Sequence, residues 1–322
     1  MLQLSRIVTF ERLNFKTKHQ SQCSNHSYNS LFMSIQAKII SFFLGITNAK
    51  RLVEKSFQNP PRSTRFFTPS NLKKTFKVSE FELMNKSVVT LQPQINPENI
   101  HLLFFHGGAY VVEGNAMHWK IIETIVTKTN CKVSYIDYPL APECNYKQTF
   151  EMVQQAYDLL INAFPDDRFM LIGDSAGAGL ALAFTQKLIK ENAPVIPVKN
   201  ILFSPWLDLS MQNPEIKKLV FKDKLLPLNG LIDAGKKYSG GDDTSNYLLS
   251  PINGDFAGIG KTIVFFGTCE LFYPDCKLLE EKVKTIGNFS FHEFAGMQHD
   301  WVIFPIPEAT EALNLAIEFI KH

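Results

Sequence analysis

The chain has few cysteines and lacks the spacings that cross-links or metal centres need. Its five cysteines are odd in number and include no Cys-x-x-Cys pair. A disulfide framework needs paired cysteines, and a structural zinc site needs closely spaced ones. The sequence therefore predicts neither kind of site, and a reducing, cytoplasmic location is the expectation.

An excess of one charge is also missing. Lysine and arginine number 33 and aspartate and glutamate 31, which gives a net charge of +2. The two signs are mixed along the chain, so no basic stripe is available for a phosphate backbone. Nucleic acid is therefore not an expected partner.

Long hydrophobic runs are absent as well. No apolar core of a secretory signal precedes residue 31, and the more apolar segment from Leu31 to Ile46 has only 16 residues, with Gln36 and Lys38 inside it. A bilayer-spanning helix needs about 20. Large apolar residues of this segment share one helical stripe, and we expect that stripe to pack over the site as part of a cap, with no membrane contact. Its members are Ile35, Ile39, Phe42, Phe43 and Ile46.

What is present is the alternation of an α/β protein. An antiparallel hairpin is predicted over 76–91, and later apolar runs are typical of strands buried on both faces. These runs cover 102–105, 133–136, 169–172, 201–203, 263–266 and 289–294. Helical patterns lie between most of them, for example at 119–129, 148–163 and 275–285, which favours a mostly parallel twisted sheet with helices on both faces.

The pattern also divides the chain into segments. Residues 1–30 show little periodicity, and we expect a poorly structured extension there, followed by an N-terminal cap segment over 31–74. The core is predicted over 75–322. Within it the alternation lapses at 205–250, where prolines and glycines punctuate the sequence, so this interval is interpreted as an insertion that belongs to the cap.

The most informative motif is Gly173-Asp174-Ser175-Ala176-Gly177, which follows the apolar run 169–172 and precedes a helical pattern. In a nucleophile elbow a serine sits on a sharp strand-to-helix turn, and the flanking glycines let the backbone pass close to itself. Ser175 is therefore the predicted nucleophile.

A serine hydroxyl needs a base, and the base needs a group that orients it. In this kind of fold the acid and then the histidine follow the serine in the chain. Glu270 and His299 both stand just beyond predicted strand ends, where a parallel sheet presents its ligand-facing groups. Asp275 is the alternative acid, and His292 is the other late histidine but lies inside a strand.

A stabiliser for the substrate's oxyanion is predicted in the turn His106-Gly107-Gly108-Ala109, which directly follows the run 102–105. Glycines there let backbone N–H groups face the site, and the N–H of Ala176 adds a further donor. We therefore expect Gly107, Gly108 and Ala176 to form the oxyanion hole. His106 is interpreted as a structural residue that bonds backbone groups.

Together these motifs resemble the hormone-sensitive-lipase-like branch of the α/β-hydrolases. The segments 137–143 (Asp-Tyr-Pro-Leu-Ala-Pro-Glu) and 204–208 (Ser-Pro-Trp-Leu-Asp) are similar to two further motifs of that family, so the resemblance covers about 75–322. It implies a carboxylesterase or lipase acting on short- to medium-chain acyl esters, with a helical cap. Ala109, Pro139 and Glu270 depart from the usual glycine, arginine and aspartate.

The function predicted from these residues is a serine hydrolase that forms an acyl-enzyme on Ser175, with His299 as base and Glu270 as the orienting acid. No cofactor or metal is needed for that chemistry, and the expected partner is a small-molecule ester. Two alternatives remain at this point: a non-catalytic ligand-binding member of the fold, and an acyltransferase or amidase with the same nucleophile. The presence of His299 argues against the first.

Overall fold

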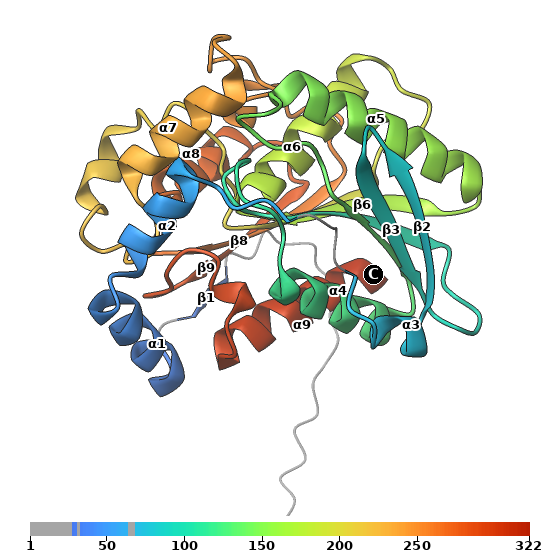
Figure 1. Cartoon of the computed structure of the whole chain (residues 1–322), viewed down its shortest axis with the longest axis horizontal. Helices are drawn as coiled ribbons and strands as arrows, with labels where there is room; N and C mark the ends of the chain where they lie inside the picture. The colour runs from blue at the N-terminus through green and yellow to red at the C-terminus, as the bar shows by residue number, and fades with distance from the viewer. Residues whose placement is uncertain (1–27, 31–32, 64–67) are drawn as a thin grey trace, which may run out of the picture.

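A computed structural model of the chain describes residues 28–30, 33–63 and 68–322 (Figure 1). The predicted extension at 1–30 therefore lies almost wholly outside the described residues. The strands run in a single sheet. Their bounds are β1 Tyr28–Ser30, β2 Lys77–Leu83, β3 Lys86–Gln92, β4 Ile100–Phe105, β5 Lys132–Ile136, β6 Arg168–Asp174, β7 Lys199–Phe203, β8 Lys261–Gly267 and β9 Phe289–Phe294.

The sheet has the order β1-β9-β8-β7-β6-β4-β5-β3-β2. In this order, each neighbouring pair from β1 through β9, β8, β7, β6 and β4 to β5 is parallel. The strand β3 pairs with β5 and with β2 in antiparallel fashion. The predicted mostly parallel α/β sheet is confirmed, and so is the hairpin at its edge. Every apolar run named from the sequence is a strand, because a strand covered on both faces needs apolar residues throughout.

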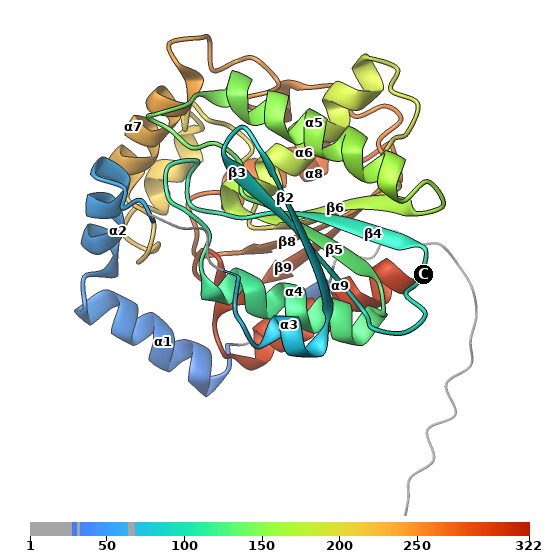
Figure 2. The ribbon, with the colours of Figure 1, turned by 45° about the vertical axis from the view of Figure 1, so that its right-hand side comes forward.

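The helices cover both faces of the sheet (Figures 1 and 2). Their bounds are α1 Ile35–Ile46, α2 Ala49–Gln58, α3 Leu72–Thr75, α4 Ala116–Thr129, α5 Tyr146–Ala163, α6 Ser175–Lys190, α7 Leu228–Ser239, α8 Tyr273–Lys282 and α9 Pro307–Lys321. One core cluster joins the sheet to α5, α6 and α8, and a second joins it to α4 and α9. The two layers of helices therefore hold the strand ends in fixed positions.

Asparagine caps begin two of the covering helices. Asn115 accepts a hydrogen bond from the Met117 N–H at 2.8 Å, and Asn145 accepts one from the Lys147 N–H at 3.0 Å. Such a side chain satisfies a backbone donor that has no partner within the helix. The caps explain why α4 and α5 begin a few residues before the periodic stretches found in the sequence.

The expected position of the apolar stripe on α1 is wrong. The helix forms as predicted, but the stripe faces outward, with Ile35 73% and Phe42 61% exposed. The buried side chains of α1 are the small ones, Ala37 and Ser41. It is α2 that contacts α7 of the insertion, and the side chain of Phe57 on α2 is buried. None of the described helices is long and apolar enough to span a membrane.

Candidate active site

Ser175 stands at the corner between β6 and α6, at the carboxyl end of the central strand. Its φ of +52° is in the left-handed region, which is rare for a residue with a side chain. The flanking glycines permit this turn. A Cβ on Gly173 would lie 2.5 Å from the carbonyl carbon of Gly177, and one on Gly177 would lie 2.0 Å from the carbonyl oxygen of Phe105. The geometry is that of a nucleophile elbow.

A chain of hydrogen bonds leads away from this serine. The Ser175 Oγ lies 2.8 Å from the His299 Nε2, and the His299 Nδ1 lies 2.6 Å from the Glu270 Oε2. The other carboxylate oxygen of Glu270 accepts from the Gly267 N–H at 2.6 Å and from the Ser204 hydroxyl at 3.1 Å. The side chains of Ser175, His299 and Glu270 are all buried. The structure thus brings together the serine, histidine and glutamate that the sequence singled out.

The alternative acid and histidine lie elsewhere. Asp275 belongs to the first turn of α8, where its Oδ1 accepts from the Asn213 amide at 2.7 Å. Burial raises the pKa of Asp275 to about 7, and no hydrogen bond joins it to His299 among the described residues. His292 lies within β9. Neither group takes part in the arrangement around Ser175.

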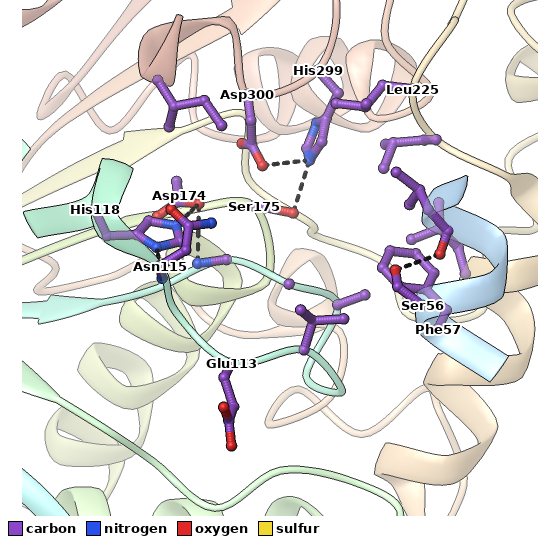
Figure 3. Close-up of a pocket in the computed structure, with 18 residues that line it drawn as sticks. Ser56, Phe57, Glu113, Asn115, His118, Asp174, Ser175, Leu225, His299 and Asp300 are labelled. Atoms are coloured by element: carbon purple, nitrogen blue, oxygen red, sulfur yellow. Dashed lines mark hydrogen bonds and ion pairs between the residues drawn. The ribbon is translucent and has the colours of Figure 1, made fainter. Parts of the chain in front are cut away.

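A second carboxylate approaches His299 from the side of the serine, and sequence reasoning missed it. The Asp300 Oδ2 lies 3.1 Å from the His299 Nε2, the same nitrogen that contacts Ser175, as Figure 3 shows. Burial raises the pKa of Asp300 to about 6, against the effect of the neighbouring imidazole. Burial also disfavours charge on His299, but Asp300 and Glu270 outweigh it and raise the pKa of His299 well above its usual range.

The turn after β4 needs one correction. The Gly107 N–H donates to the Asp174 carboxylate at 3.0 Å, so it is not free for a substrate oxygen as we expected. Among the described residues, no acceptor is recorded for the N–H groups of Gly108 and Ala109. Both have positive φ, +116° and +54°. The N–H of Ala176 lies in the first turn of α6, where helix donors lack internal partners.

Asp174 connects this turn to α4. Besides Gly107, its Oδ2 contacts the His118 Nε2 at 3.3 Å, and the two side chains form a buried ion pair. Burial opposes charge on both groups, but their mutual attraction raises the pKa of His118 and lowers that of Asp174. His106 bonds the Gly107 carbonyl through Nδ1 at 2.6 Å, and burial lowers its pKa to about 3. Its predicted contact with a backbone group is confirmed.

A pocket of about 170 Å³ opens beside the serine. Its polar end holds Ser175, His299, Asp300 and the turn after β4, and its other walls are mostly apolar (Figure 3). Most of the apolar side chains come from α2, the segment before α7 and α7 itself: Val53, Phe57, Leu225, Leu226 and Leu231. Val112, after β4, and Ile303, after β9, also line the pocket. An apolar cavity of about 150 Å³ is enough to bind benzene. The pocket thus suits a small apolar group held next to Ser175.

A buried serine–histidine–carboxylate chain at the elbow of such a sheet defines the class of the protein. Residues 102–303 match the model of the family described as having the alpha/beta hydrolase fold, and the chain belongs to that family. It is 31% identical over 224 residues to an esterase of Acinetobacter venetianus, across 68% of this chain and 73% of the relative. An acetyl-hydrolase of Streptomyces hygroscopicus is 29% identical, across 68% and 75%.

The solved structures agree on the fold. A crystal structure of an esterase from the bacterial hormone-sensitive lipase family superposes with a TM-score of 0.74 at 22% identity, and covers 90% of this chain and 99% of that one. Membership of the α/β-hydrolases, expected from the sequence motifs, is confirmed by the family match and by the esterase relatives. The chain is a carboxylic-ester hydrolase.

Proposed function

We propose that the protein hydrolyses carboxylic esters with short acyl chains through an acyl-enzyme on Ser175. The observation that carries this proposal is the continuous contact from the Ser175 Oγ through His299 to Glu270, with distances of 2.8 and 2.6 Å. A serine is a weak nucleophile until a base within hydrogen-bond reach takes its proton, and the base must hold the correct tautomer. Glu270 supplies that condition by accepting the Nδ1–H of the imidazole.

In the first half of the reaction, the Ser175 oxygen attacks the ester carbonyl while its proton moves to the His299 Nε2. The carbonyl oxygen becomes an oxyanion, for which we assign the N–H groups of Gly108, Ala109 and Ala176 as donors. The C–O bond to the alcohol then breaks, and His299 passes its proton to the leaving oxygen. Water repeats the sequence on the acyl-enzyme, which releases the acid and restores the serine.

We further propose that α2, the segment 214–227 and α7 form the cap that selects the acyl chain. Most of the apolar wall of the pocket comes from these elements, whereas the reacting groups come from the strand ends. The acetyl-hydrolase among the relatives fits a small pocket. Replacing Leu226 by alanine should shift the preference among p-nitrophenyl esters towards longer acyl chains, because the space that the side chain leaves adjoins the acyl group. An unchanged chain-length profile would exclude this wall.

The test of the central proposal is Ser175→Ala. We expect hydrolysis of p-nitrophenyl acetate to fall on the order of 10³-fold or more, and labelling by a fluorophosphonate to disappear, while the thermal unfolding transition is retained. His299→Ala should lower turnover comparably, because groups that act as a unit are not additive. If the Ser175 variant kept near-normal turnover, the assignment of the nucleophile would fail.

A further inference from the structure

The outward face of α1 is an exposed apolar surface that the proposed function does not use. Five large apolar side chains on this one face are 49–73% exposed: Ile35, Ile39, Phe42, Phe43 and Ile46. A contiguous apolar face of this kind on a protein surface marks an interaction site. Its position on one side of a twelve-residue helix gives it the form of a docking face.

Contacts on the opposite side fix the orientation of the helix. Its N-cap, Ser34, places both its N–H and its hydroxyl on the Glu308 carboxylate of α9, at 2.5 and 2.9 Å. The Lys224 Nζ donates to the hydroxyl of Ser41 at 3.1 Å, on the buried side. A rotation that turned the phenylalanines inward would break these contacts. The apolar face is therefore held outward by the fold.

Two chain segments that carry or adjoin this face are basic. Residues 33–58 and 214–224 contain eight lysines and arginines against three carboxylates, whereas the whole chain has 33 against 31. The two segments adjoin, since the Lys50 Nζ donates to the Val220 carbonyl at 2.6 Å. Phe221, next along the chain, is 95% exposed. The exposed cations Lys38 and Lys222 have no ion pair among the described residues.

We propose that this face binds an anionic lipid surface, with α1 lying in the plane of the interface. An interfacial helix buries an apolar face among the acyl chains while nearby lysine and arginine side chains contact anionic headgroups. The same positive charges disfavour the binding of a second molecule of this protein to the apolar face of α1. A symmetric contact would place the two basic surroundings against each other, and like charges at an interface are costly.

The position of the pocket supports lipid binding by this face. This support rests on the proposed function. The helix that follows α1 supplies Val53 and Phe57 to the pocket wall, and the basic segment 214–224 leads directly into Leu225 and Leu226. The two segments that would touch the lipid are thus continuous with the two that enclose the acyl group. Both α1 and α2 lie along the same edge of the molecule in Figures 1 and 2. Esters dissolved in a membrane would reach the serine from that edge.

The first test is co-sedimentation of the full chain with vesicles of phosphatidylcholine, with and without phosphatidylglycerol. We expect binding to the anionic vesicles, and at least a tenfold weaker partition coefficient for the variant Ile39→Ser/Phe42→Ser/Phe43→Ser. The matched control, Leu159→Ser/Leu278→Ser, removes exposed apolar side chains from α5 and α8 and should bind like the parent. All variants should hydrolyse p-nitrophenyl acetate in solution at the parent rate.

The second test addresses the charges. Lys38→Glu/Arg51→Glu/Lys222→Glu should abolish the preference for anionic vesicles, whereas Lys120→Glu/Lys128→Glu on α4 should retain it. Raising the salt from about 0.1 M to 1 M shortens the screening length from about 10 Å to 3 Å and should weaken binding of the parent.

Three results would overturn the inference. The first would be a parent protein that stays in the supernatant with anionic vesicles. The second would be a control variant that loses as much binding as the α1 variant. The third would be a dimer, found by light scattering, that the α1 substitutions dissociate. The last outcome would assign the face to a second copy. Ser175→Ala separates this inference from the proposed function, because that variant should lose hydrolysis and keep vesicle binding.

Discussion

Replacing Glu270 by glutamine is the sharpest test of how the base is oriented. In the parent, the Glu270 Oε1 accepts hydrogen bonds from two donors, the Gly267 N–H at 2.6 Å and the Ser204 hydroxyl at 3.1 Å. A glutamine would keep its carbonyl oxygen at these donors. Its NH₂ group would then face the Nδ1 of His299, now 2.6 Å from the Oε2. Nδ1 would have to accept, and the proton would move to Nε2.

An imidazole with its proton on Nε2 donates to the Ser175 hydroxyl and cannot take its proton. A wrong tautomer of this kind lowers kcat on the order of 10⁴-fold, which is about 5.5 kcal/mol of transition-state stabilisation. KM for p-nitrophenyl acetate should change little, because Glu270 is absent from the pocket lining. The fold should be retained, since both donors to Oε1 keep their acceptor.

The matched control is Asp275→Asn, which makes the same chemical change in the other candidate acid. We expect its kcat to remain within a few-fold of the parent value, because Asp275 bonds Asn213 and not the histidine. Steady-state kinetics at pH 8, with circular dichroism of each variant, gives the comparison. The reasoning would be refuted if the kcat of Glu270→Gln stayed within tenfold of the parent value, or if Asp275→Asn lost more kcat than Glu270→Gln.

The remaining predictions concern pH and the elbow. Asp300→Asn should move the acidic limb of the pH dependence of kcat/KM to lower pH, because Asp300 raises the pKa of His299 and the base must be neutral to act; an unmoved limb would exclude that coupling. Burial raises the pKa of Asp275 to about 7, so the stability that its proton contributes is fully present below about pH 4 and is lost as the pH rises through 7. Thermal unfolding of Asp275→Asn should therefore show a smaller loss of stability between pH 5 and 8 than the parent, and parallel curves would contradict this. Gly177→Ala should prevent correct folding, since its Cβ would lie 2.0 Å from the Phe105 carbonyl oxygen, and a soluble, active variant would show that the turn can relax.

The sheet and the serine–histidine–glutamate chain could be predicted because both leave local marks. A strand buried on two faces appears in the sequence as a run of apolar residues. Parallel strands bring the residues that follow their carboxyl ends to one edge of the sheet. That is why Glu270 and His299 could be paired with Ser175 although 124 positions separate the histidine from the serine.

Other features depended on geometry that the sequence does not encode locally. The stripe on α1 has the period of a packed helix, but its opposite side, with Ala37 and Ser41, is small enough to lie closer to the fold, so periodicity alone chose the wrong face. Asp300 reaches His299 because its own φ is +50°, which turns the chain back on itself. Its place directly after the histidine was the only signal. The engagement of the Gly107 N–H by Asp174 depends on two segments 67 positions apart.

The division of the pocket between strand ends and cap has a consequence for how such an enzyme can change. Its reacting groups follow the strands of the sheet, which are hydrogen-bonded to one another, whereas most of the apolar wall is contributed by α2, the segment before α7 and α7 itself. Libraries of variants at Val53, Phe57 and Leu231 would therefore change substrate preference while leaving the reacting residues unchanged. An ancestral gene could exchange its cap by recombination and still inherit a working nucleophile.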